Sequence, residues 1–288
     1  MGSVCHPDFD LDAYLDRIAY VGVRDPSIAV LRALCSAHPQ TIAFENIDPL
    51  LGHPPSLNLV HIQAKLVGAK RGGYCFEHNA LLRQALLALG FGVTSLAARV
   101  VWMAAPGMLL RPRTHMLLLV EVPADAAGPY IVDAGFGGHL INLPLRLQAD
   151  LVQASPLSRV RLMQAVEVFT LETELPAGWS PIYRFTLEPQ LPADYEPLNW
   201  FTATHPASIF RQNLLMERLT PTRRANLLND RLTLRVVGGA TELRRIASAA
   251  EFEQVMREVF GLRLPVSTVA QLFERVPKGR EAPLVPDV

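Results

Sequence analysis

Apolar residues recur at helical spacing in three segments of the first ninety residues. The segments 11–20 and 27–37 carry hydrophobic side chains three or four positions apart, which predicts two amphipathic helices. A third segment begins near Tyr74, directly after a Gly-Gly pair, and continues to Gly90, a residue typical of helix ends. Cys35 lies on the apolar face of the second segment, so we expect it in the core.

Short β-rich runs broken by proline and glycine follow from residue 92 onwards. They cover 95–103, 115–122, 130–133 and 159–168. These runs predict an antiparallel sheet or small barrel. Farther on, 181–187 and 232–237 predict strands and 249–260 an amphipathic helix, so the last third mixes both types. Two proline-bearing stretches, 176–181 and 188–197, lack the length and polarity of flexible linkers, and we expect the parts to pack as one body.

The composition is that of a globular protein with small-molecule partners. The 288 residues are 50% hydrophobic and 19% charged, and 27 basic residues balance 27 acidic ones. This excludes disordered and fibrous classes and leaves no basic cluster for nucleic acid or an anionic membrane. The first residues do not resemble a signal peptide, and no apolar run reaches the length of a membrane span, so we expect a cytoplasmic protein. Three irregularly spaced cysteines argue against a disulfide framework.

Cys75 has the most reactive setting of the three cysteines. It falls in the first turn of the third predicted helix, where the positive end of the helix and the free backbone N–H groups favour the thiolate. Gly72 and Gly73 leave room before it for another backbone or a ligand. The alternative is that Cys75 is simply a small buried residue.

A thiolate nucleophile needs a base, and eight histidines are available. Six of them sit in polar or Pro/Gly-rich surroundings that indicate surface or loop positions: His6, His38, His53, His61, His139 and His205. His78 is three residues after Cys75 but has no evident acidic partner. His115 opens a strongly apolar run, which places its imidazole beside core residues. It is either a hydrogen-bonded core residue or a base.

Asp133 supplies a reason to favour the base. It ends a short apolar strand, and a hairpin around residues 123–129 would bring it toward His115. A buried carboxylate needs a partner, and an imidazolium supplies one. The carboxylate would in turn orient the ring, as in a nucleophile–base–acid triad. Cys75, His115 and Asp133 therefore form a candidate triad.

Two other patterns are weaker. The glycine-rich segment 135–138 lacks the Gly-x-Gly-x-x-Gly spacing of dinucleotide sites and, by pattern alone, indicates a structural turn. Cys75 and His78 have Cys-x-x-His spacing, but no second pair completes a zinc site. We expect no bound metal.

Taken together, three motifs resemble the arylamine N-acetyltransferase family in order and spacing. They are Arg-Gly-Gly-Tyr-Cys-Phe-Glu-His-Asn at 71–79, Thr-His-Met at 114–116 and Val-Asp-Ala-Gly-Phe-Gly at 132–137. The segment 41–48, with its Phe-Glu-Asn, and the region 199–211 extend the resemblance over most of the chain. One departure is Ala43, where many members have proline, which affects only the local loop.

The resemblance implies an α+β fold with a cysteine-protease/transglutaminase-like core. Its parts are a helical domain (1–91), an antiparallel β-barrel domain (92–195) and an α/β lid domain (196–288). It also implies ping-pong acetyl transfer from acetyl-coenzyme A (acetyl-CoA) to an aromatic amine or hydrazine, and a role in xenobiotic metabolism. The acetyl group passes through a thioester on Cys75, with no tightly bound cofactor.

Roles for individual residues follow from the same resemblance. His115 is the base, Asp133 orients it, and the backbone N–H groups of Cys75 and of Thr114 or His115 are candidate oxyanion donors. The expected substrate and coenzyme A contacts are Phe44, Tyr74, Phe136, Gly135, Gly137 and Gly138. The expected structural anchor of the Cys75 loop is Arg71 with Glu45 or Asn46, as an interior ion pair or hydrogen bond.

Alternatives remain open at this point. The same triad serves cysteine hydrolases and transglutaminase-type enzymes, and a related amide synthase would pass a longer acyl chain within one molecule. A non-catalytic binding protein is disfavoured because all three triad residue types are present. The shape of the pocket, rather than the motifs, decides the natural amine and the acyl chain length. The motifs do not determine the oligomeric state, and a homodimer is one of the open alternatives.

Overall fold

The computed structural model describes residues 5–102, 104, 111–123, 125–155 and 158–279. Its N-terminal part is helical, with a π-helical turn and one short strand. The elements are α1 (Leu11–Arg17), α2 (Ile28–Thr41), β1 (Phe44–Glu45), α3 (Ile47–Leu51), α4 (Leu59–Gln63), a π-helix (Ala64–Gly68) and α5 (Cys75–Ala88). The three expected helices are confirmed at α1, α2 and α5. Gly90 has φ +90°, the left-handed geometry expected just after α5.

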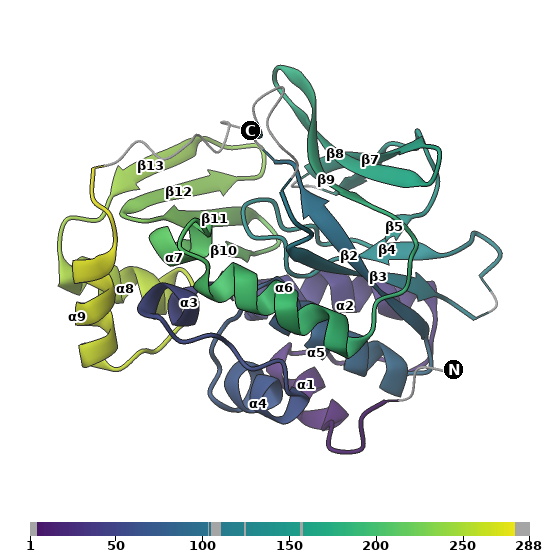
Figure 1. Cartoon of the computed structure of the whole chain (residues 1–288), viewed down its shortest axis with the longest axis horizontal. Helices are drawn as coiled ribbons and strands as arrows, with labels where there is room; N and C mark the ends of the chain where they lie inside the picture. Colours follow the sequence, from purple (N-terminus) through teal and green to yellow (C-terminus); the bar gives the residue numbers. More distant parts are fainter. Residues whose placement is uncertain (1–4, 103, 105–110, 124, 156–157, 280–288) are drawn as a thin grey trace.

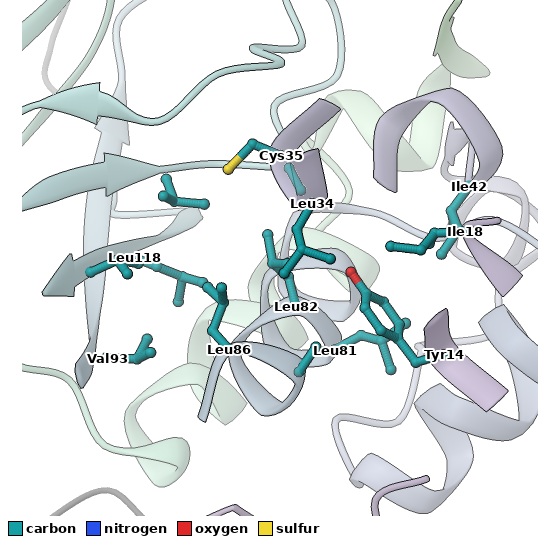
Figure 2. Close-up of a cluster of buried hydrophobic side chains, with 14 of the residues drawn as sticks. Tyr14, Ile18, Leu34, Cys35, Ile42, Leu81, Leu82, Leu86, Val93 and Leu118 are labelled. Carbon is teal, nitrogen blue, oxygen red and sulfur yellow. The ribbon is translucent and has the colours of Figure 1, made fainter. Parts of the chain in front are cut away.

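Helices α2 and α5 pack against two strands to form the largest core. Leu82 and Leu86 of α5 belong to one cluster with Cys35 of α2 and Leu118 of the sheet, and each is at most 3% exposed (Figure 2). Each such leucine contributes about 1.5–3 kcal/mol by leaving water. Cys35 is a core residue, as its position on the apolar face predicts.

The central part is an antiparallel sheet of eight strands that curves into a nearly closed barrel. Its order is β5-β4-β3-β2-β9-β8-β7-β6. The strands are β2 (Gly92–Val100), β3 (His115–Glu121), β4 (Tyr130–Val132), β5 (Leu145–Arg146), β6 (Gln153–Ser155), β7 (Ser158–Ala165), β8 (Val168–Leu175) and β9 (Gly178–Phe185). The single strand expected over 159–168 is wrong. Val166 has φ +57° and turns the chain, so β7 and β8 form a hairpin.

The last part combines a second antiparallel sheet with helices. It contains α6 (Pro192–Thr204), α7 (Ile209–Gln212), β10 (Leu215–Leu219), β11 (Arg223–Leu228), β12 (Arg231–Val236), β13 (Thr241–Arg245), α8 (Ala249–Glu258) and α9 (Val266–Arg275). Helices α8 and α9 lie at one end of the molecule beside this sheet. Helix α6 crosses the middle of the molecule (Figure 1). The sheet order is β1-β10-β11-β12-β13, so the short strand β1 from the N-terminal part completes it.

The protein therefore has the expected α+β fold, with a helical part, a barrel and an α/β part. The chain crosses between the parts more than once, because β1 pairs with β10 through Phe44–Glu217 and Glu45–Met216. The expected boundary between residues 195 and 196 falls inside the continuous helix α6 and not at a break between elements.

Candidate active site

Cys75 is the first residue of α5 and lies in a tightly packed turn. Its side chain is 3% exposed, and Sγ lies 3.6 Å from the Thr114 carbonyl oxygen, to which the thiol donates. The preceding turn requires glycine. A Cβ at Gly72 would lie 2.2 Å from the Ala43 carbonyl oxygen, and one at Gly73 would lie 2.7 Å from Glu77 Oε2. The Gly-Gly pair thus permits the close backbone approach that seats the turn.

His115 and Asp133 meet as the β3–β4 hairpin predicts. The strands pair with Leu118 opposite Val132, and His115 Nε2 lies 2.6 Å from Asp133 Oδ2. Burial by itself would lower the pKa of His115, but the Asp133 carboxylate and the nearby Cys75 side chain raise it to about 10. Burial works against ionisation of Asp133 too, yet His115 keeps its pKa below the usual range. The pair is therefore an imidazolium–carboxylate pair near neutral pH, with Nδ1 left for Cys75.

Asn79 fixes the Asp133 carboxylate from α5, one turn after Cys75. Its Nδ2 donates to Asp133 Oδ1 at 3.1 Å and to the Met116 carbonyl oxygen at 2.7 Å, and its Oδ1 accepts from Ala134 N at 3.0 Å. Sequence reasoning assigned Asn79 no role, although its position four residues after Cys75 places both on one helix face.

A cavity of about 150 Å³ opens over these groups. Of the expected contact residues, it is lined by Phe44, Phe136, Gly135 and Gly137, together with Cys75, Thr114 and His115. Other lining side chains were not among the expected contacts: Trp102 and Arg111, and Ile209 and Phe210 from the region 199–211. The walls next to the nucleophile are thus largely aromatic.

Tyr74 and Gly138, two of the expected contacts, do not line this cavity. Tyr74 is fully buried, its hydroxyl donates to Asn199 Oδ1, and its ring meets Phe210 edge-on. Gly138 N instead donates to Glu217 Oε2 at 2.5 Å. Tyr74 therefore packs behind Phe210, which lines the cavity, and Gly138 fixes the glycine-rich loop to Glu217.

Thr114 does not meet its expected role as an oxyanion donor. Its backbone N–H donates to the Ala98 carbonyl oxygen at 3.2 Å, a pairing between β2 and the residue before β3. This N–H group is therefore hydrogen-bonded within the sheet and does not point to the cavity as a free donor. The backbone N–H of Cys75, at the start of α5, keeps the position expected of an oxyanion donor.

The anchor of the Cys75 loop is a buried ion cluster. Arg71 binds Glu45 at 2.7 Å and Asp48 at 3.0 Å, and Lys65 joins the cluster to Glu77 at 2.8 Å. Although burial opposes it, the carboxylates hold the pKa of Arg71 above its usual value. Of the two expected partners of Arg71, Glu45 is the one that it contacts.

Asn46, the other expected partner, is placed elsewhere. Its amide donates to the Phe210 and Asn213 carbonyl oxygens at 2.9 and 2.8 Å, and its Oδ1 accepts from Leu215 N. Asn46 therefore connects the N-terminal part to α7 and β10, and no hydrogen bond joins it to Arg71 among the described residues.

The expectation of a surface or loop position is wrong for His38, which is buried within α2. His139 lies in the loop after β4, as expected, but it is buried. His78 Nε2 donates to the Ala43 carbonyl oxygen at 3.2 Å, which leaves Nδ1 to accept from His38 Nε2 at 2.8 Å. The hydroxyl of Tyr14 then donates to His38 Nδ1 at 2.9 Å. Burial lowers the pKa of His78 to about 4, so this chain is neutral.

Glu217 and Arg224 hold the glycine-rich loop from the second sheet. The fully buried Glu217 carboxylate accepts from Gly138 N and, at 3.2 Å, from Leu140 N, and it pairs with Arg224 at 2.6 Å. Arg224 also donates to the Leu140 carbonyl oxygen at 3.0 Å. Sequence reasoning missed both residues because they are about eighty positions from the loop.

Within the described ranges, no group of three or more His, Cys, Asp or Glu side chains is arranged to hold a metal ion. In the same part of the chain, no helix combines the length and apolar character needed to cross a membrane.

Comparisons with known proteins agree over nearly the whole chain. A family-level sequence model described as N-acetyltransferase matches residues 27–269. The arylamine N-acetyltransferase of Mycobacterium tuberculosis (strain ATCC 25618 / H37Rv) is 42% identical over 92% of each chain, and that of Escherichia coli (strain K12) is 41% identical over 88% of each. The Mycobacterium marinum arylamine N-acetyltransferase in complex with CoA superimposes with a TM-score of 0.88 at 38% identity, covering 93% of this chain and 99% of that one.

Proposed function

The chain belongs to the arylamine N-acetyltransferase family and is an acyltransferase, and from that premise we propose that it moves an acetyl group from acetyl-CoA to aromatic amines and hydrazines by a ping-pong mechanism through Cys75. The observation that carries the proposal is the convergence of three side chains: Cys75 at the start of α5, beside His115, which binds Asp133 at 2.6 Å. This is the arrangement that activates a thiol and stabilises the imidazolium formed with it.

In the first half-reaction the Cys75 sulfur attacks the thioester carbonyl of acetyl-CoA. A new C–S bond forms on Cys75, the bond to the coenzyme A sulfur breaks, and the imidazolium of His115 supplies the proton to the departing thiol. One thioester replaces another, so the step is nearly balanced in free energy. The backbone N–H of Cys75 supports the oxyanion from the start of α5.

In the second half-reaction the amine attacks the acetyl-Cys75 carbonyl. An aromatic amine is a weak base, hence neutral and nucleophilic near pH 7, and neutral His115 removes its extra proton as the tetrahedral intermediate collapses. Asp133 keeps the ring oriented through Nε2, so Nδ1 faces the reaction. The sulfur of Cys75 leaves and the cycle closes.

The cavity walls suit a planar amine. Phe44, Trp102, Phe136 and Phe210 line it beside Cys75, and aromatic faces and edges pack well against an aryl ring. We assign the backbone of Gly135 and Gly137 to the approach of coenzyme A. A Cβ at Gly137 would lie 2.1 Å from the Phe44 ring, so only glycine fits there.

We propose three domains that meet at this cavity. Residues 1–91 supply the nucleophile Cys75, 92–195 supply its base, and 196–288 supply Phe210 as a lid residue. A hydrolase, a transglutaminase-type enzyme or an amide synthase could use the same triad. The relatives named N-acetyltransferase favour transfer to an external amine.

Intact and peptide mass spectrometry after brief incubation with acetyl-CoA tests the proposal. One acetyl group should appear on Cys75 and disappear when an aromatic amine or hydrazine is added, with the acetylated amine as product. The Cys75→Ser variant should lose this labelling, and Cys5→Ser, outside the cavity, should keep it. If Cys75 reacts with an alkylating agent but never carries acetyl, the coenzyme A assignment fails.

A further inference from the structure

A second cavity lies behind the catalytic groups. It has a volume of about 280 Å³ and is enclosed by α5, β2, β3, the start of α6 and the loop before α4. It shares no lining residue with the cavity over Cys75. Phe76 and Met116 form part of its wall, and each directly follows a triad residue in the sequence. Because neighbouring residues of a strand face opposite sides, His115 and Met116 place the two cavities on opposite faces of β3.

Arg83 gives this cavity an uncompensated positive charge. Its Nε is buried without a hydrogen-bond partner, and within the described residues its guanidinium forms no ion pair. No aspartate or glutamate lines the cavity. Partial burial lowers the pKa of Arg83, and no carboxylate lines the cavity to offset this effect. A buried donor left unpaired costs free energy that a bound acceptor would restore.

Neighbouring polar groups do not serve Arg83, because they are bonded elsewhere. The hydroxyl of Tyr195 donates to the Leu96 carbonyl oxygen at 2.9 Å, and the side chain of Gln84 accepts from His6 N at 2.9 Å. The guanidinium is the charged group of this wall whose Nε has no hydrogen-bond partner, and its planar fork matches a carboxylate.

The remainder of the wall is mainly apolar, with His6, Asn58 and Ser95 as its polar members. Leu57, Phe76, Met116 and Pro192 contribute to it, and the volume is at the lower end of the range of small-molecule sites, roughly 300 Å³ upward. Such a space suits one ring with a short chain, with a single charge at one end.

We propose that this cavity is a second binding site, for a small organic monocarboxylate with an apolar body, held by Arg83 and separate from the acetyl-transfer site. The carboxylate pairs with the guanidinium, and the apolar body packs on Phe76 and Met116. Binding does not involve Cys75, so occupancy is independent of coenzyme A and of the acetylation state.

Isothermal titration calorimetry of the full chain tests the proposal with 3-phenylpropanoate, using 3-phenylpropan-1-ol as the uncharged match. The acid should bind at least tenfold more tightly than the alcohol, and saturating coenzyme A should leave its affinity unchanged. Arg83→Gln should weaken binding of the acid at least tenfold. Arg257→Gln, an exposed arginine on α8, should not. Ala80→Leu narrows the cavity without touching the charge and should also abolish binding, which keeps a test available if Arg83→Gln does not fold.

Equal affinity for acid and alcohol, no binding of the acid, or unchanged binding in Arg83→Gln would overturn the proposal. Displacement of the acid by coenzyme A would also overturn it, by assigning the acid to the acetyl-transfer cavity. These outcomes differ from a failure of acetyl transfer, because neither probe nor variant involves Cys75.

Discussion

Replacing Asp133 by asparagine should remove most of the activation of Cys75 without changing the shape of the site. In the native protein the pKa of His115 is about 10, against 6.5 for a free imidazole. At 1.36 kcal/mol per pH unit, the imidazolium is stabilised by on the order of 5 kcal/mol. Asp133 is the largest source of this stabilisation and opposes the effect of burial, so in the variant burial makes His115 neutral at pH 7. We therefore expect acetylation of Cys75 to slow by about three orders of magnitude at pH 7.

The assay is the single-turnover rate of acetyl-Cys75 formation, followed by quenched-flow mass spectrometry between pH 6 and 9. Asp125→Asn is the matched control, because Asp125 lies in the β3–β4 connection and accepts a hydrogen bond from Tyr130 at 2.7 Å but is remote from Cys75. Its rate should stay within a factor of two of the native rate. A folded Asp133→Asn variant that acetylates Cys75 within tenfold of the native rate would refute the assignment of Asp133 as the group that holds the imidazolium.

The same variant carries a stability prediction whose sign follows from the two pKa shifts. The folded-state pKa of His115 lies above its reference value of 6.5, so its contribution is complete below pH 6.5 and is lost as the pH rises through about 10. The pKa of Asp133 is lowered from 3.8, so its contribution is lost as the pH falls through the lowered value. Denaturant unfolding should show the largest difference between native and Asp133→Asn protein between pH 3.8 and 6.5.

Three further changes test the surroundings of the site. Arg71→Ala leaves the buried Glu45 carboxylate without its cation and should lower the free energy of unfolding by about 3–5 kcal/mol, measured by urea denaturation; no loss would contradict its role as an anchor. Glu217→Gln should lower that free energy by about 2 kcal/mol and raise KM for acetyl-CoA more than it changes kcat, because the glycine-rich loop loses a charged acceptor; unchanged kinetics would separate the loop from the donor site. Gly137→Ala places a Cβ on the Phe44 ring and should reduce kcat/KM at least tenfold in steady-state assays, whereas a fully active variant would show that the ring moves aside at little cost.

Local patterns were sufficient to single out a candidate triad, and the resemblance to the family assigned its members their roles. Cys75 was placed by a helix start after two glycines, and His115 and Asp133 by a hairpin whose two strands are both strongly apolar. Short-range rules set each of these positions: helix capping, strand alternation and the need of a buried carboxylate for a partner. The distance of 2.6 Å between the ring and the carboxylate required the register, which sequence patterns do not specify.

The errors at His38 and Tyr74 share one physical origin, which is that burial depends on neighbours in space rather than in the chain. His38 has polar sequence neighbours, yet Tyr14 and His78 enclose it from other helices. Tyr74 was expected among the substrate contacts on the family resemblance, but as the residue before α5 it points toward Asn199. In both cases the local pattern located the element correctly and could not tell which side of it the tertiary contacts would cover.

The same reasoning explains why Glu217 had no sequence signal. It lies on β10, a strand that pairs with β1, and only this pairing brings its carboxylate to the glycine-rich loop. The loop that shapes the active-site cavity is thus held by a residue about eighty positions away, so its geometry depends on completion of the second sheet. Destabilising β10 should therefore impair the acetyl-transfer site even though the strand contributes no triad residue. Through Glu217 the last third of the chain fixes the shape of the cavity. This is a more direct link to catalysis than covering the cavity alone would be.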